Sequence, residues 1–422
     1  MHQTLSQVSG ATTAVPPLPD TFSSSGCTTP QRGIVEAARR DIARVGAASQ
    51  LVRVAREAFR RRDVDFLCFG ESDHPAPQSA VAALKQALDD GETRYPDIRG
   101  LPALREALAD YLTALHRRPV SETRIAVTAS GMAALNVAFS ALLRPNDAVV
   151  VISPSWPNPV NLATLRGAKI REVVLTYGES GFALDMDLLD QALAGARVLF
   201  LNSPNNPTGW CARDAELTAI LELCRKHGAW IVADDVYSRL VYDGREAAPS
   251  MLDHAQSGDK LIVCNSFSKA WAMTGFRVGW LVMPDGLRDE IGEHVELTHS
   301  AVAPFSQRAA LAALADCEFI PKFRAYCAAG RSIVEDALSG IRGLRYRSPD
   351  ASFYAFAHLD GIEDSEALAM RLVRDHQVAI APGSAFGAGG EGFIRLCFAQ
   401  SPTRLHRAMA RLQQSLGETS LR

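Results

Sequence analysis

The chain has 422 residues, of which 47% are hydrophobic and 22% charged, as in globular proteins with room for two domains and a large core. Its net charge of -3 gives no electrostatic reason to expect nucleic acid or an anionic membrane as a partner. No apolar run approaches the roughly 20 residues that a membrane-spanning helix requires. The eight cysteines are scattered without a C-x-x-C pair, which favours a reduced, cytoplasmic protein over a disulfide framework or a metal site.

The predicted elements alternate between helices and strands along most of the chain. Residues 1–32 are rich in Ser, Thr, Pro and Gly, and we expect a flexible tail there rather than a secretory signal. Residues 34–62 have a helical pattern, and residues 65–69 predict a strand that leads into the loop 70–77. Further helices are predicted at 79–89, 101–115 and 131–143, and strands at 125–128, 148–153, 198–202, 230–234 and 261–265. This alternation indicates a mainly parallel sheet with helices on both faces.

The last quarter of the chain predicts a second, smaller unit. Residues 311–339 have the pattern of a long helical connection. They are followed by strands at 352–357 and 393–399 and by helices at 365–376 and 402–416. We therefore expect an α/β protein with a large domain over residues 76–318. A smaller α+β domain would combine residues 33–75 with 319–422.

The most informative motif follows the strand predicted at 261–265 and has the sequence SFSKAWAMTGFR. The carboxyl ends of strands are where open α/β sheets bind their ligands. The amine of Lys269 can form an imine with an aldehyde, and Ser266, Ser268 and Arg277 can hold a phosphate. Pyridoxal 5'-phosphate needs both. A solvated position is the ordinary expectation for lysine or arginine alone, but the spacing and the flanking strands favour this cofactor.

Two polar residues lie at or just after the end of the strand predicted at 230–234. Asp234 offers a carboxylate that can keep the cofactor's pyridine nitrogen protonated, so that the ring accepts electrons. Tyr237 lies three residues further on and can donate a hydrogen bond to the ring's phenolic oxygen. The pair Asp234-Asp235 is also compatible with a turn or a helix cap, which is the commoner role for such residues.

Several other segments are ambiguous when taken alone. Residues 128–135 join a strand to a helix through small residues, and the amides of such a helix start can bind phosphate. Residues 202–209 contain Asn-Pro-Thr-Gly, which is first of all a turn sequence. Arg395 lies in the apolar strand 393–399, where a guanidinium needs an anionic partner. That partner is either a ligand or an Asp or Glu of the same domain.

Taken in order, these motifs resemble the class I/II pyridoxal-phosphate-dependent aminotransferases, the aspartate-aminotransferase-like enzymes of fold type I. The signature S-x-S-K-…-G-x-R-x-G of that family is present from Ser266 to Gly279, and the resemblance extends from about residue 34 to 416. It implies that Lys269 binds the cofactor as an aldimine. It also implies a ping-pong transfer of the amino group from an L-amino acid to a 2-oxo acid, with Lys269, Asp234 and Tyr237 as the catalytic residues.

The resemblance implies further roles for individual residues. Additional cofactor contacts would come from Ser130, Gly131, Met132, Trp156 and Asn206. Arg395 would bind the substrate α-carboxylate, with Gly70 and Asn206 beside it. Tyr95 matches a tyrosine that reaches the cofactor phosphate of a neighbouring subunit, and it therefore implies a homodimer with shared sites. No metal is expected at this site.

Two departures from the family pattern leave the substrate open. The family's Gly-Glu-Pro-Asp-Phe loop is GESDH at residues 70–74, and its Pro-x-Gly-Ala-Phe-Tyr segment is PDASFY at residues 349–354. The same cofactor and fold also serve lyases and enzymes of specialised metabolism that eliminate, cyclise or oxidise, and the motifs do not separate these reactions. A transcription regulator that senses the cofactor would need a DNA-binding module, for which the tail of about 32 residues is too short.

Overall fold

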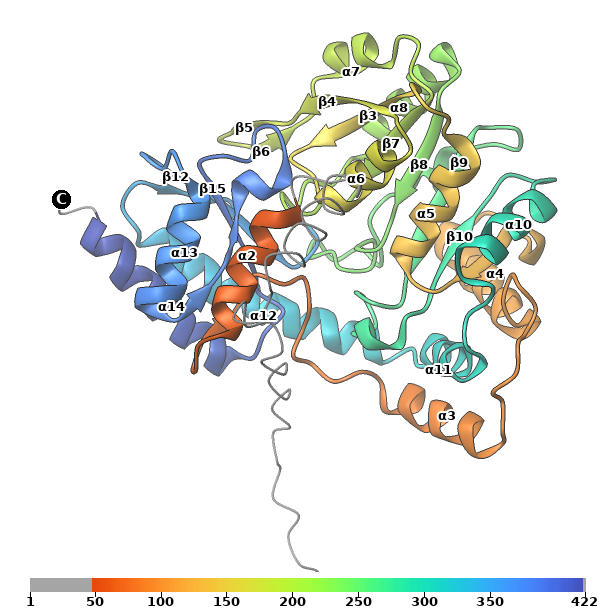
Figure 1. The fold of residues 1–422 in the computed structure, drawn as a ribbon, viewed down its shortest axis with the longest axis horizontal. Helices are drawn as coiled ribbons and strands as arrows, with labels where there is room; N and C mark the ends of the chain where they lie inside the picture. The colour runs from red at the N-terminus through yellow and green to blue at the C-terminus, as the bar shows by residue number, and fades with distance from the viewer. Residues whose placement is uncertain (1–47, 420–422) are drawn as a thin grey trace, which may run out of the picture. The chain divides into compact units, whose positions relative to one another are not determined.

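The structure is a computed structural model that describes residues 48–419, so the tail predicted over residues 1–32 lies outside the described residues. Its largest sheet has seven strands in the order β2-β10-β9-β8-β7-β3-β4 (Figure 1). These are β2 (Ile125–Thr128), β3 (Ala148–Ser153), β4 (Lys169–Val174), β7 (Val198–Asn202), β8 (Trp230–Asp234), β9 (Leu261–Ser266) and β10 (Gly279–Val282). Neighbouring strands are parallel except where β10 pairs with β9 and β2. The predicted mainly parallel sheet is therefore confirmed.

The strands of this sheet are apolar because both of its faces are buried. In β8, Ile231 and Ala233 belong to the core on one face, whereas Val232 belongs to the core on the other. Helices α5 (Gly131–Leu142), α6 (Pro157–Leu165) and α10 (Arg288–His299) contribute to the second of these cores. Helices α4 (Pro102–His116), α7 (Met186–Leu193), α8 (Asp214–His227) and α9 (Met251–His254) contribute to the first.

Polar residues end the strands of this sheet on one edge. The last residues of β2, β3, β7, β8 and β9 are Thr128, Ser153, Asn202, Asp234 and Ser266. Parallel strands end at the same edge, so the fold gathers these side chains and the loops that follow them. The antiparallel strand β10 begins at this edge, where Gly279 is paired with both Thr128 and Ser266.

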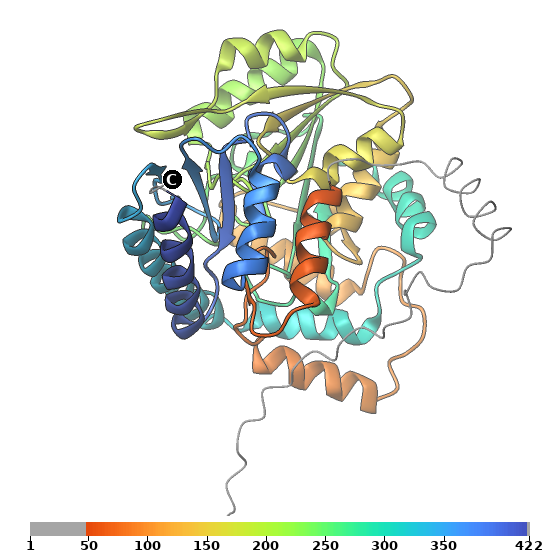
Figure 2. The same ribbon diagram turned by 60° about the vertical axis from the view of Figure 1, so that its left-hand side comes forward.

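A smaller antiparallel sheet has the order β11-β12-β15-β14, with β11 (Leu344–Arg345), β12 (Tyr354–Leu359), β15 (Phe393–Cys397) and β14 (Ala381–Pro382). Helices α13 (Ser365–His376) and α14 (Pro402–Thr419) pack near it. Helix α2 (Ala48–Phe59) lies beside α13, as the red and blue helices of Figure 2 show. Strand β1 (Asp65–Phe66) pairs in parallel with β13 (Val378–Ala379). The domain boundaries expected from the sequence stay a prediction.

The remaining elements are α3 (Gln78–Asp89), the hairpin of β5 (Thr176–Gly178) and β6 (Gly181–Ala183), and the helices α11 (Pro304–Ala315) and α12 (Phe319–Ser339). The long helical connection predicted over 311–339 is interrupted between α11 and α12, because Asp316 leaves the helical conformation and accepts a hydrogen bond from Ser79. The predicted strand 352–357 begins later, at Tyr354, since Ser352 has a φ of +68°. Within the described residues no helix is both long enough and apolar enough to cross a membrane.

Candidate active site

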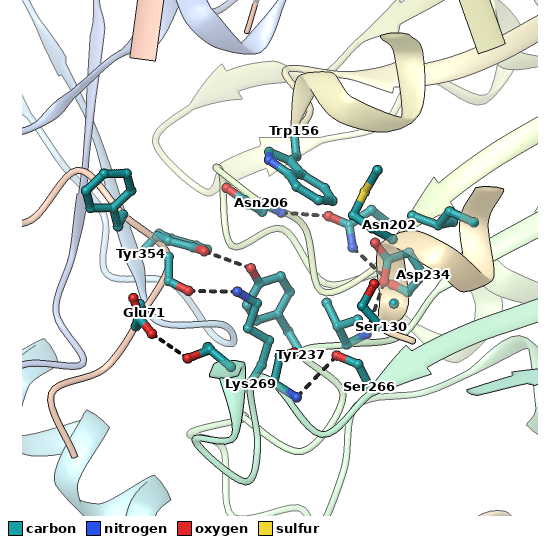
Figure 3. Close-up of a pocket in the computed structure, with 18 of the residues that line it drawn as sticks. Glu71, Ser130, Trp156, Asn202, Asn206, Asp234, Tyr237, Ser266, Lys269 and Tyr354 are labelled. Atoms are coloured by element: carbon teal, nitrogen blue, oxygen red, sulfur yellow. Dashed lines mark hydrogen bonds between the residues drawn. The ribbon is translucent and has the colours of Figure 1, made fainter. Parts of the chain in front are cut away.

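A cavity of about 350 Å³ opens at the polar edge of the large sheet, and Figure 3 shows side chains that line it. All but one of the residues predicted for the site line this cavity. They are Gly70, Ser130, Gly131, Met132, Trp156, Asn206, Asp234, Tyr237, Ser266, Ser268, Lys269, Arg277 and Arg395. The exception is Tyr95, which lies between α3 and α4 with 90% of its surface exposed. Its predicted contact is with a neighbouring subunit and stays a prediction.

Lys269 lies in the loop between β9 and β10, and its amine points into the cavity (Figure 3). The Nζ atom donates a hydrogen bond of 2.7 Å to the carbonyl oxygen of Gly70. Burial lowers the pKa of Lys269 to about 8, because the charged ammonium is poorly solvated there. The amine is therefore neutral, and able to attack a carbonyl carbon, at a much lower pH than an exposed lysine.

Asp234 ends β8 at the floor of the cavity and is 4% exposed. Burial raises the pKa of its carboxyl group to about 7, although the Val236 amide donates a hydrogen bond to it at 3.3 Å. A cation placed against this carboxylate would stabilise its charged form. The neighbouring Asp235 has a different role, since its carboxylate accepts a hydrogen bond of 2.6 Å from the Ser250 hydroxyl.

Tyr237 shares a hydrogen bond of 2.7 Å with the hydroxyl of Tyr354, a cavity residue that the sequence analysis did not assign to the site (Figure 3). Tyr354 also sets the position of the loop at Gly70, because a Cβ atom on that residue would lie 2.0 Å from the Tyr354 hydroxyl oxygen. The strand pairing explains its place: Phe356 is paired with Arg395, so Tyr354 lies on the same face of the sheet, diagonal to that arginine.

Arg395 is 2% exposed and lies between two aromatic rings. Its guanidinium carbon is 4.4 Å from the ring centre of Tyr354 and 4.8 Å from that of Phe386. Nη1 donates to the Asn206 side-chain oxygen at 2.9 Å, Nη2 donates to the Cys68 carbonyl, and Nε has no partner.

None of the ion pairs found among residues 48–419 involves Arg395. The structure therefore does not contain the salt bridge that was the alternative explanation for this arginine. A buried guanidinium without a carboxylate partner is suited to bind the carboxylate of a ligand.

Hydrogen-bond donors gather at the other end of the cavity, where α5 begins. Ser130 caps the helix by accepting a hydrogen bond of 3.1 Å from the Ala133 amide, and the following amides are at the helix start. The hydroxyl of Ser266 accepts a hydrogen bond of 3.3 Å from the Ser268 amide, and Arg277 lines the same end. Two hydroxyls, a guanidinium and a helix start are the donor set that a phosphate group needs.

The backbone is closely packed at this end of the cavity. A Cβ atom on Gly279 would lie 2.5 Å from the carbonyl carbon of Ser130 and 2.6 Å from the Gly131 nitrogen. Only glycine therefore allows β10 to approach the start of α5. The phosphate donors, the buried carboxylate of Asp234 and the reactive amine of Lys269 lie in one cavity, and this combination fits pyridoxal 5'-phosphate.

Several cavity residues were not predicted from the sequence: Leu51, Phe69, Glu71, Leu135, Asn202, Val236, Thr274 and Tyr354. Asn202 joins two predicted residues, because its amide nitrogen donates to the Asp234 carbonyl at 3.0 Å and its oxygen accepts from the Asn206 amide at 2.8 Å. The others reach the cavity through packing between segments far apart in the chain. Among the described residues, no group of three or more side chains is arranged to hold a metal ion.

The chain matches the family model of class I and II aminotransferases over residues 63–412. An aspartate aminotransferase of Thermotoga maritima is 33% identical over 357 residues, which cover 84% of this chain and 92% of that protein. An aspartate/prephenate aminotransferase of Cereibacter sphaeroides is 32% identical, with coverage of 83% and 91%. The crystal structure of an aromatic aminotransferase from Pyrococcus horikoshii has a TM-score of 0.80 at 30% identity, with coverage of 87% and 100%. As the sequence predicts, the chain belongs to the class I and II aminotransferases and is a pyridoxal-phosphate-dependent aminotransferase of fold type I.

Proposed function

We propose that this cavity carries out both half-reactions of amino transfer, first from an L-amino acid and then to a 2-oxo acid. One observation supports this most directly. The same cavity contains the Lys269 amine, whose pKa is lowered, and the buried guanidinium of Arg395, which has no carboxylate partner among the described residues. The first group can accept a proton, and the second can hold the carboxylate that every α-amino acid carries.

The residues at the phosphate end and the floor would hold the cofactor. Its phosphate would be bound by the side chains of Ser130, Ser266, Ser268 and Arg277, by the amides of Gly131 and Met132, and by Tyr95 of a second subunit. Asp234 would neutralise the protonated ring nitrogen, Tyr237 and Asn206 would donate hydrogen bonds to the phenolic oxygen, and Trp156 would stack on the ring. When bound, pyridoxal phosphate supplies an aldehyde that bonds to the amino nitrogen and a ring that accepts electrons.

The protein's own contribution to the reaction is to position the substrate and move its proton. Arg395 would hold the α-carboxylate with two parallel hydrogen bonds, with Gly70 and Asn206 beside it, which fixes the orientation of Cα. Lys269 Nζ would take the proton from Cα and pass it to the aldehyde-derived carbon of the bound cofactor. In the second half of the reaction it would move a proton in the opposite direction. A base in such a position typically accelerates proton transfer by about 10²–10⁴-fold.

We also propose that the enzyme is a cytoplasmic homodimer that binds small molecules only. Its large domain would cover residues 76–318 and its small domain residues 33–75 and 319–422, of which 33–47 lie outside the described residues. Two exposed apolar residues support the dimer. Tyr95 is 90% exposed, and Leu297 of α10 is 86% exposed. The loop of Tyr95 lies close to α10, because a Cβ atom on Gly292 would be 3.5 Å from Ile98. Large apolar side chains that are exposed in one subunit are typical of an interface.

Isotope transfer tests the proposed reaction. The holoenzyme is incubated with each of a panel of ¹⁵N-labelled L-amino acids and one unlabelled 2-oxo acid, and products are identified by mass spectrometry. We expect the label in a new amino acid formed from the added oxo acid, and no transfer by Lys269→Ala. Labelled ammonia, without a new amino acid, would instead indicate a lyase and contradict the proposal.

A further inference from the structure

Three side chains of the cavity lining that are assigned neither to the α-carboxylate nor to the phosphate are apolar: Leu51, Phe69 and Met132. We propose that the amino donor carries an uncharged, largely apolar side chain, aromatic or long aliphatic, which binds against Leu51, Phe69 and Met132. These three residues are called the apolar wall below. The inference rests on the proposed function and adds the class of substrate to it. The proposed donor differs from aspartate, the dicarboxylic amino acid after which the Thermotoga and Cereibacter relatives are named.

The apolar wall is built from three separate segments of the chain. Leu51 belongs to α2, Phe69 follows β1, and Met132 lies in the first turn of α5. All three are partly buried and pack against the cores described above. The Phe69 ring is held in place by two others, with ring centres 6.3 Å from Phe66 and 6.0 Å from Phe59. An apolar substrate side chain would therefore meet a preformed surface.

Every cation of the cavity lining already has a role. Among the described residues that line the cavity, the cationic side chains are Lys269, Arg277 and Arg395. The proposed function uses the first for proton transfer, the second for the phosphate and the third for the α-carboxylate. A second substrate carboxylate would lose water at this wall without gaining a further cation from the described residues of the same subunit, which is unfavourable.

A negatively charged side chain in the cavity lining makes a dicarboxylate still less favourable. Glu71 lines the cavity beside Phe69, and its carboxylate accepts a hydrogen bond from the Thr274 hydroxyl. Its backbone carbonyl accepts a second hydrogen bond of 2.6 Å from Gln400, which fixes this segment. A carboxylate on the substrate side chain would meet a carboxylate of the protein here. This repulsion discriminates against aspartate and glutamate.

A matched pair of inhibitors tests the wall without any turnover. Succinate and 3-phenylpropionate both offer one carboxylate to Arg395. The other end of succinate is a second carboxylate, whereas the other end of 3-phenylpropionate is a phenyl ring. We measure the dissociation constant of each from the holoenzyme by isothermal titration calorimetry. We expect 3-phenylpropionate to bind at least about tenfold tighter. Equal or tighter binding of succinate would overturn the inference.

Steady-state kinetics separates this inference from the proposed function. The value of kcat/KM is measured for phenylalanine, methionine and leucine against aspartate, glutamate and lysine, with one common 2-oxo acid. We expect the best apolar donor to exceed each charged donor by about 10- to 100-fold. A preference for a charged donor would overturn the inference and leave amino transfer intact. Failure of every donor would contradict the proposed function, while the inhibitor pair would still decide the character of the wall.

A charge placed in the wall gives the reverse test. Leu51 is only partly buried, so Leu51→Lys adds a cation where the helix surface can accommodate it, and Leu51→Met is the matched apolar control. In Leu51→Lys we expect the preference for 3-phenylpropionate over succinate to fall by at least about tenfold. In Leu51→Met the preference should stay unchanged. If the lysine variant folds and keeps the original preference, Leu51 does not contact the substrate side chain and the wall is wrongly assigned.

Discussion

Individual residues of the site are tuned by burial rather than by ion pairs. The Lys269 ammonium is poorly solvated, which lowers its pKa, whereas the carboxyl group of Asp234 is buried, which raises its pKa. Each shift is a cost to the protein that a bound ligand of the right charge can relieve. Lys269 and Asp234 are thus residues whose charged forms are destabilised by burial in the fold.

The low pKa of Lys269 predicts a pH dependence that can be measured on the apoprotein. Because burial lowers the pKa from 10.5 to about 8, the neutral amine predominates above pH 8 and is scarce below it. Lys322 is the internal control, since its hydrogen bond to Glu318 raises its pKa. The apoprotein is treated with pyridoxal phosphate and borohydride, and peptides are quantified by mass spectrometry. We expect labelling of Lys269 to rise with a midpoint near pH 8, well before that of Lys322. Parallel rises at the two lysines would contradict the assignment.

Tyr354 is predicted to act as a positioning residue for Tyr237. Tyr354→Phe removes the hydroxyl but keeps the ring beneath Arg395, so we expect kcat to fall by about tenfold, equivalent to about 1.4 kcal/mol, with little change in KM. The pH at which the cofactor's absorbance changes should also shift. Tyr354→Phe should also lose about 0.5–1.5 kcal/mol of unfolding free energy, the usual effect of one lost hydrogen bond.

The control for Tyr354 is Tyr242→Phe, which loses a hydrogen bond of 2.6 Å to the Ser352 carbonyl outside the cavity lining. It should reduce stability without changing kcat or the absorbance. If Tyr354→Phe behaves in the same way, its hydroxyl has a purely structural role.

At the scale of elements, the site depends on how closely the sheet and the phosphate-binding helix approach one another. Strand β10 is paired with both β9 and β2, and α5 packs against β9 and β10. Gly279 lies at the point of closest approach, so its lack of a side chain controls the distance between the helix start and the lysine loop.

Gly279→Ala is expected to weaken both cofactor binding and stability. A Cβ atom at this position overlaps backbone atoms of Ser130 and Gly131, which must then move, and overpacking of this kind costs about 1–3 kcal/mol. Urea unfolding of the apoprotein and titration with pyridoxal phosphate measure the two effects. Gly275→Ala is the control, because a Cβ atom there has nothing within 4 Å. Equal behaviour of the two variants would show that the close approach is unimportant.

The sequence predicts the elements of the large sheet better than it predicts the site's surroundings. Strands such as β3 and β7 are recognised to the residue because burial on both faces makes them continuous apolar runs. The reactive residues could be predicted because they lie in short motifs next to these strands. Leu51 and Tyr354 could not, since their roles arise from contacts between distant segments. Asp65 shows the same limit: it is fully buried and hydrogen-bonded to Arg407, 342 residues away.

For the whole molecule, the proposed dimer predicts that two inactive variants restore each other. In a hybrid of Lys269→Ala and Tyr95→Ala subunits, one site would combine the intact lysine of one chain with the intact tyrosine of the other. Random mixing should therefore recover up to about a quarter of the wild-type activity. Activity is measured after unfolding and refolding the two variants together, and each variant refolded alone is the control. No recovery, with dimers present in analytical ultracentrifugation, would show that Tyr95 does not act across the interface.

Strand β10 runs opposite to its two neighbours, and this has a consequence for how the enzyme could diversify. The segment between β9 and β10 leaves and returns to the sheet at one edge, and the Phe267 amide closes it with a hydrogen bond of 3.1 Å to the Val278 carbonyl. The reacting lysine is thus carried by a closed loop, whereas Leu51 and Phe69 come from segments outside the large sheet. Substitutions in α2 or in the segment after β1 can therefore change which amino acid binds without moving the Lys269 amine. The reacting lysine and two of the three residues of the apolar wall thus lie on separate parts of this chain.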